Sequence, residues 1–207
     1  MKLVAPLSLL TFIGLFLVLI FSQKASAIGV GLGGSLTANQ RIAQTTTSSF
    51  TSDSYLTYGG GLVVGQPLSK GSLLLETGLL YSVRKVGFGV DLTQEFQALN
   101  LPFMLKIKII PMLSFGLGAY LSHGFGKVAT SSNKAEKKLG FEGSGIEPLD
   151  YGLQLALGTN LTLTSSISLF GDLRFSYGIN DIITSTTAEG YQRALVLMVG
   201  LRVGDRL

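Results

Sequence analysis

Period-two alternation of apolar and polar residues is the feature that most constrains how this chain folds. In residues 149–161, for example, Leu153, Leu155 and Leu157 alternate with Gln154 and Gly158. Such alternation is typical of β-strands that have one apolar and one polar face. It recurs in eight segments, which are residues 28–38, 56–65, 73–84, 99–109, 113–122, 149–161, 167–179 and 191–203.

The connections between these segments alternate between long and short. The long ones are residues 39–54, 85–94, 127–148 and 180–190, and the short ones are residues 66–71, 110–112 and 162–166. This order is typical of an up-and-down barrel with loops at one end and turns at the other. We therefore predict an all-β fold, an eight-stranded antiparallel up-and-down transmembrane β-barrel. Pro102 lacks an N–H donor, so we also expect a β-bulge there.

The size of the apolar face predicts which face meets lipid. The eight segments carry about forty large apolar side chains, whereas an eight-stranded barrel has an interior just wide enough to be filled by side chains. The opposite face consists of Gly, Ser and Ala with a few charges, and charged residues are only 14% of the chain. We therefore expect the apolar face to point outward. The alternative is a soluble periplasmic ligand-binding barrel, which would need an apolar lumen.

The first 27 residues have the pattern of a secretory signal. Lys2 is followed by an almost entirely apolar run over residues 3–21, and then by Ala25, Ser26 and Ala27. This order predicts a signal peptide over residues 1–27, cleaved after Ala27, and a mature barrel over residues 28–207 in the outer membrane. The alternative is a retained transmembrane helix, because the run is just long enough to span a bilayer.

Charged residues on the polar face predict a salt-bridge network with a structural role in the lumen, because charges removed from bulk water need partners. We expect its centre to be Glu76 and Asp172 with Lys106 and Arg174. The full predicted set is Glu76, Arg84, Lys106, Lys108, Asp150, Asp172, Arg174 and Arg202.

Five tyrosines on the apolar face lie toward the loop ends of their segments. Tyrosine has an apolar ring and a polar hydroxyl, so this placement predicts an interfacial aromatic girdle. Its members are Tyr58, Tyr81, Tyr151, Tyr177 and Tyr191.

No motif in the sequence indicates catalysis. Residues 29–34 match G-x-G-x-x-G, but no strand precedes them and no helix follows, so the glycines instead fit a strand packed inside a narrow barrel. His123 is the only histidine and the chain has no cysteine. We predict no catalytic residues, no cofactor and no metal site, and a protein that is not an enzyme.

The longest loop mixes both signs of charge. It contains Lys127, Lys134, Lys137 and Lys138 together with Glu136, Glu142 and Glu147. Two interpretations remain open, a solvated loop and a contact surface for anionic lipopolysaccharide or a protein partner.

Four stretches resemble the PorT-like family of small outer-membrane β-barrel proteins. They are Leu99–Lys108 (LNLPFMLKIK), Phe115–Tyr120 (FGLGAY), Asp150–Leu153 (DYGL) and Asp172–Asp181 (DLRFSYGIND). The resemblance implies a small eight-stranded barrel of Gram-negative bacteria. Most members have no assigned activity, and the founding type is linked to protein secretion and gliding.

These observations predict an integral outer-membrane protein with a plugged polar lumen and a structural or interaction role through its extracellular loops. One alternative is an accessory subunit of a secretion or cell-envelope machine, which would have co-purifying partners. The expected partners are outer-membrane lipid, lipopolysaccharide and envelope proteins, but not nucleic acid. We expect a monomer.

Overall fold

The computed structural model describes residues 28–45, 49–51, 54–69, 72–88, 92–132, 135–183 and 188–204. The predicted signal peptide, residues 1–27, lies outside the described residues, so its cleavage remains a prediction. Within the described residues, no helix is both long and apolar enough to cross a membrane.

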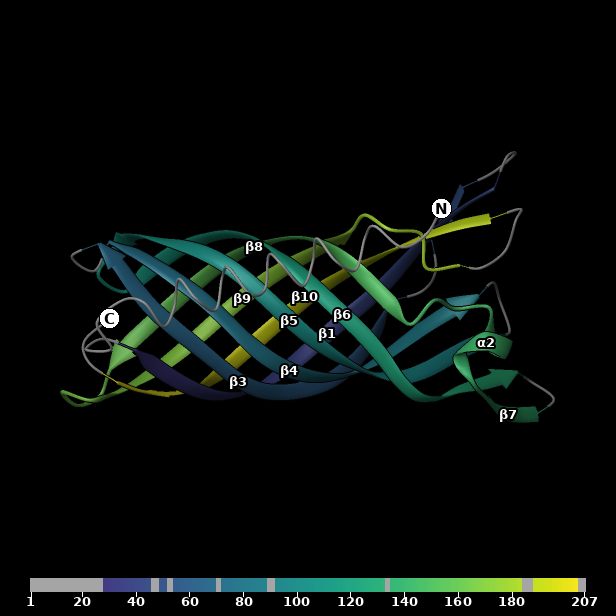
Figure 1. Ribbon diagram of the computed structural model, residues 1–207, viewed down its shortest axis with the longest axis horizontal. Helices are drawn as coiled ribbons and strands as arrows, with labels where there is room; N and C mark the ends of the chain where they lie inside the picture. Colours follow the sequence, from purple (N-terminus) through teal and green to yellow (C-terminus); the bar gives the residue numbers. More distant parts are fainter. Residues whose placement is uncertain are drawn as a thin grey trace, which may run out of the picture.

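Eight long antiparallel strands form a closed barrel (Figure 1). Each strand pairs with the next along the chain, and β10 pairs with β1 from Val30 opposite Val203 to Thr45 opposite Ala188, which closes the sheet. The predicted fold class is confirmed. The barrel strands are β1 (Gly29–Thr45), β3 (Tyr55–Ser69), β4 (Leu73–Phe88), β5 (Leu92–Ile110), β6 (Leu113–Ser132), β8 (Leu149–Thr162), β9 (Ile167–Gly178) and β10 (Ala188–Val203).

Two short strands and one short helix extend one end of the barrel. β2 (Ser49–Thr51) pairs with the end of β1, and β7 (Ala135–Leu139) pairs with the end of β6. The helix α2 (Phe141–Ser144) follows β7. In Figure 1, β7 and α2 lie at the end of the barrel opposite the short turns that join β3 to β4, β5 to β6 and β8 to β9. We call these the loop end and the turn end.

Alternation in the sequence becomes alternation of burial in the strands. Along β8, Leu153, Leu155 and Leu157 are about half exposed, whereas Asp150 and Gln154 are buried. The apolar face is therefore the outer face, as predicted. An apolar band around the whole molecule would be a large exposed patch in water, but it matches the hydrocarbon of a bilayer. A closed barrel also pairs the backbone groups that lipid cannot hydrogen-bond.

Three of the predicted loops are shorter than the sequence indicated. β1 continues to Thr45, β6 continues to Ser132, and most of residues 85–94 belongs to β4 and β5. The alternation of apolar and polar residues ends where both faces of a strand are exposed to water. The backbone hydrogen bonds between the strands continue past that point. The apolar pattern therefore marks the membrane-facing part of each strand and underestimates the strand's length.

The predicted β-bulge at Pro102 is wrong. Pro102 lies in regular register opposite Tyr120, and the register shifts between β5 and β6 occur elsewhere, at Glu95/Gln97 and at Lys108/Ile110. Beside Pro102, the β4–β5 ladder skips two pairs without changing register. At this gap the hydroxyl of Thr77 donates a hydrogen bond of 2.9 Å to the carbonyl oxygen of Pro102.

Glycines make room for a large side chain in the lumen. Phe170 of β9 is 2% exposed and clusters with Val63, Leu80 and Met198. A Cβ atom added at Gly31 or at Gly33 would lie 3.0 Å from the Phe170 ring. Packing within the narrow barrel therefore accounts for Gly31 of the G-x-G-x-x-G pattern, whereas a Cβ atom added at Gly34 would have no neighbour within 4 Å.

Candidate functional site

Charged side chains from four strands meet inside the barrel, toward its turn end. We call this group the ionic cluster; it consists of Glu76 (β4), Lys106 (β5), Asp172 and Arg174 (β9), and Arg202 (β10). Each residue occupies one of the alternate positions of its strand whose side chains point into the barrel. Glu76 and Arg202 are 126 residues apart in the sequence, so only barrel closure brings them into contact.

Glu76 is the centre of the ionic cluster. Its side chain is fully buried, and its carboxylate lies 2.9 Å from Lys106 Nζ, 2.7 Å from Arg174 Nη2 and 2.6 Å from Arg202 Nη2. Asp172 accepts hydrogen bonds from Lys106 Nζ, at 2.8 and 2.7 Å, and from Arg174 Nη2, at 2.6 Å. Such short charge-assisted bonds offset the large cost of removing five charges from water. The cluster carries three cations and two carboxylates.

Arg84 and Asp150 form a second group closer to the loop end. Arg84 Nη1 donates to Asp150 Oδ2 at 2.7 Å and to Gln192 Oε1 at 2.8 Å, and Arg84 Nη2 donates to Asn100 Oδ1 at 2.7 Å. The hydroxyl of Tyr120 lies 3.2 Å from both carboxylate oxygens of Asp150. The predicted single network is therefore two groups. The sequence-based prediction missed Asn100, Tyr120 and Gln192. Their positions in the alternating pattern place them on the inward face, so they could have been included.

Lys108 belongs to neither group. It is half-buried near the turn end, and it makes no ion pair with any residue that the structure describes. This corrects its placement in the predicted network: Lys108 lies two residues beyond Lys106 along β5, out of reach of the carboxylates that Lys106 contacts.

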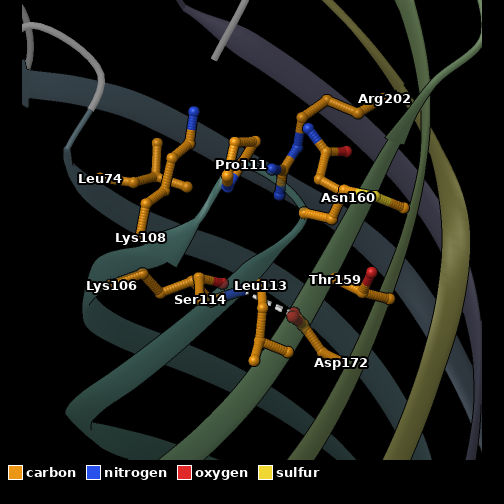
Figure 2. A pocket seen from close by; sticks show the side chains of 11 residues that line it. Leu74, Lys106, Lys108, Pro111, Leu113, Ser114, Thr159, Asn160, Asp172 and Arg202 are labelled. Carbon is orange, nitrogen blue, oxygen red and sulfur yellow. Dashed lines mark hydrogen bonds and ion pairs between the residues drawn. The ribbon is translucent and has the colours of Figure 1, made fainter.

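Lys108 instead lines a small cavity that we call the turn-end pocket (Figure 2). The volume of the pocket is about 30 Å³. Its polar lining residues are Lys106, Lys108, Asn160, Asp172 and Arg202, and Pro111 of the β5–β6 turn lies at its edge. A second small cavity, of about 50 Å³, lies between the ionic cluster and the Arg84 group, with Arg84 and Arg174 in its lining.

An apolar group lies at the loop end of the barrel. We call it the loop-end lid; it consists of Phe96, Ala98, Val128 and Ile146, with Phe141 of α2 packed against them. The rings of Phe96 and Phe141 meet edge to face, with their centroids 5.6 Å apart. Gly124 makes this possible, because a Cβ atom there would lie 2.6 Å from Phe141 Cζ. The charge pattern of residues 127–148 predicted a solvated loop or a contact surface and did not indicate the lid.

The β7–β8 and β9–β10 connections are hydrogen-bonded to each other at the loop end. Ile146 forms an isolated antiparallel bridge with Ile183, and Glu147 N donates to the carbonyl oxygen of Ile182 at 2.9 Å. Asp181 Oδ1 accepts hydrogen bonds from the backbone N–H groups of Ile183 and Gly190. The last residue of the DLRFSYGIND stretch therefore anchors the β9–β10 connection.

The five predicted girdle tyrosines lie on the outer face, toward the loop ends of their strands. Tyr58, Tyr151 and Tyr177 are 65%, 46% and 43% exposed, whereas Tyr81 and Tyr191 are half-buried. Tyr81 packs against Phe125 with the ring centroids 6.3 Å apart. Their role at a membrane interface remains a prediction.

The sequence profile of a family described as "Outer membrane protein beta-barrel domain" matches residues 21–184. No curated protein matches the chain.

Solved structures of other barrels are similar to the chain at low sequence identity. Neisserial surface protein A is 16% identical, with 88% of this chain and 99% of that chain covered and a TM-score of 0.49. Ail, the attachment invasion locus protein of Yersinia pestis, is 12% identical in its complex with a heparin analogue, with 85% and 99% covered and a TM-score of 0.46. The outer membrane protein AlkL is 12% identical, with 89% and 94% covered and a TM-score of 0.37.

Proposed function

The chain belongs to the outer membrane protein beta-barrel domain family, and from this premise we propose that it is a plugged barrel that acts through its loop end. The protein is an integral outer-membrane β-barrel. Its finer role, in our proposal, is a structural or interaction role: the lumen carries no solute, and the loop end presents a surface to molecules outside the cell.

The side chains inside the barrel are the observation that supports this proposal. From the turn end to the loop end it contains the ionic cluster, the Arg84 group and the loop-end lid, and the two cavities described above measure only about 30 and 50 Å³. Charged side chains inside the barrel are also the opposite of the apolar lumen that a soluble ligand-binding barrel would need. The protein, in this proposal, is neither a general porin nor an enzyme.

Part of the loop end consists of regular secondary structure. The extension of β6 pairs with β7, and Lys127, Lys137 and Lys138 are exposed there. Glu142 and Glu147 of the same segment are also exposed, and the lysines among them favour an anionic contact such as lipopolysaccharide. This supports an interaction role for the loop end.

Single-cysteine labelling in intact cells tests whether the loop end faces outward. The chain has no native cysteine, so one introduced thiol reports one position. Lys137→Cys lies at the loop end and Ser165→Cys lies in the β8–β9 turn, and both residues are exposed. We expect a membrane-impermeant maleimide to label Lys137→Cys in intact cells and Ser165→Cys only after the outer membrane is permeabilised. The reverse pattern would overturn the proposal.

A further inference from the structure

The turn-end pocket carries more positive charge than its carboxylate can neutralise. Lys106, Lys108 and Arg202 line it together with the single carboxylate of Asp172. Asp172 already accepts hydrogen bonds from Lys106 and Arg174. Glu76 also pairs with Lys106 and Arg202; when the whole ionic cluster and Lys108 are counted, four cations face two carboxylates, an excess of two positive charges.

Two hydrogen-bond donors in the pocket have no partner among the residues that the structure describes. Arg202 is 5% exposed and donates Nη2 to Glu76, but its buried Nε has no acceptor. Lys108 makes no ion pair, whereas the ammonium of Lys106 is used by Glu76 and Asp172. Figure 2 shows Lys108 and Arg202 beside the turn that contains Pro111. A buried donor without an acceptor is costly, so this arrangement indicates a missing anionic partner.

Size and access narrow the choice of anion. A cavity of about 30 Å³ holds roughly two water-sized groups at about 10–15 Å³ each, which matches two oxygens of a tetrahedral oxyanion. The pocket is open at the turn, since Pro111 and Met112 are exposed and Lys108 is half-buried. The rest of a larger group can therefore remain in solution.

We propose that the turn-end pocket binds a phosphate group, held between Lys108 and Arg202. Two excess positive charges match a phosphate monoester or inorganic phosphate, which carries about −1.5 to −2 at neutral pH, better than they match a carboxylate with a single charge. The donors are a flexible ammonium and a guanidinium edge, both of which bind phosphate oxygens well. This site lies at the opposite end of the barrel from the proposed interaction surface and does not depend on it.

Calorimetric titration of the full chain in maltoside micelles, which contain no phosphate, tests the site. We expect saturable binding of inorganic phosphate and weaker binding of acetate at equal ionic strength. Lys108→Gln should lower the phosphate affinity about tenfold, the effect expected from losing one charge-assisted contact. Lys127→Gln, an exposed lysine at the loop end, is the matched control and should leave the affinity unchanged.

A second titration, with glycerol phosphate, distinguishes free phosphate from a phosphate group carried on a larger molecule. Binding of both ligands would identify a phosphate carried on a larger molecule, and binding of inorganic phosphate alone would identify the free ion. Unboiled and boiled samples on a gel verify that each variant is folded. The proposal is overturned by an absence of saturable phosphate binding, by acetate binding as tightly as phosphate, or by Lys127→Gln weakening binding as much as Lys108→Gln.

Discussion

At the scale of single residues, the lumen depends on a few carboxylates that serve several cations each. Glu76 contacts three basic side chains and is fully buried, and Asp172 contacts two. Removing one member of a buried ion pair leaves its partner's charge uncompensated, which costs far more than losing a surface pair. The ionic cluster is therefore the place where a single neutral substitution should most affect stability.

Glu76→Gln should destabilise the barrel by about 3–5 kcal/mol, because it leaves three buried cations with only one carboxylate. The measurement is urea unfolding in detergent, followed by loss of the fast-migrating unboiled form on a gel. Glu142→Gln on α2 is the control, since that glutamate is exposed. Equal unfolding midpoints for the two variants would contradict the role of Glu76. A second substitution, Arg202→Gln, should recover part of the loss by removing one of the uncompensated charges.

At the scale of elements, β7 and α2, which lie between β6 and β8 in the chain, are folded parts of the barrel. β7 extends the sheet, α2 ends at Gly145 with φ of +73°, and Phe141 reaches the lumen through the space left by Gly124. A positive φ of this size favours glycine because other residues have a Cβ atom that clashes there. Few apolar contacts hold the segment, so each of them matters to its local stability.

Phe141→Ala should open this segment without unfolding the barrel. Losing a partly buried aromatic ring should cost about 1–2 kcal/mol, which is below the full cost of a buried phenylalanine. We expect trypsin to cleave after Lys137 and Lys138 faster in Phe141→Ala than in the wild type. Glu142→Ala, one residue further along the same helix, is the matched control. Equal cleavage rates in the two variants would show that the lid does not hold the segment.

At the scale of the whole molecule, closure of β10 on β1 creates both environments of the protein. The outer face carries apolar side chains that match lipid, and the enclosed face carries the buried charges of the ionic cluster. An interior of this width is filled by side chains, whereas wider barrels leave a channel. Transport through the lumen would require the ionic cluster to separate.

Planar-bilayer recording of the reconstituted protein should show no open-channel conductance of the porin type. Phe141→Ala should also show no conductance, because it disturbs the loop-end lid and leaves the ionic cluster in place. A porin reconstituted in parallel verifies the bilayers. Steady conductance in the wild type would contradict a plugged lumen, and conductance in Phe141→Ala alone would place the closure at the lid.

The sequence by itself determined the fold class and the direction of each face. Strand periodicity is local, so Leu153 and Gln154 can be assigned to opposite faces without knowing what lies beside them. Glu76, Lys106, Asp172 and Arg174 were also expected to share the lumen, because parity and position along the strands suffice to group them.

Only the tertiary structure decided which charges meet and which do not. The division between the ionic cluster and the Arg84 group, the isolation of Lys108, and the contact of Phe141 with the lumen all depend on strand register and loop path. A shift of register by two residues keeps every side chain on its face but changes its neighbours across the barrel. Periodicity therefore reports the face of a residue, whereas its partners are determined by closure of the sheet.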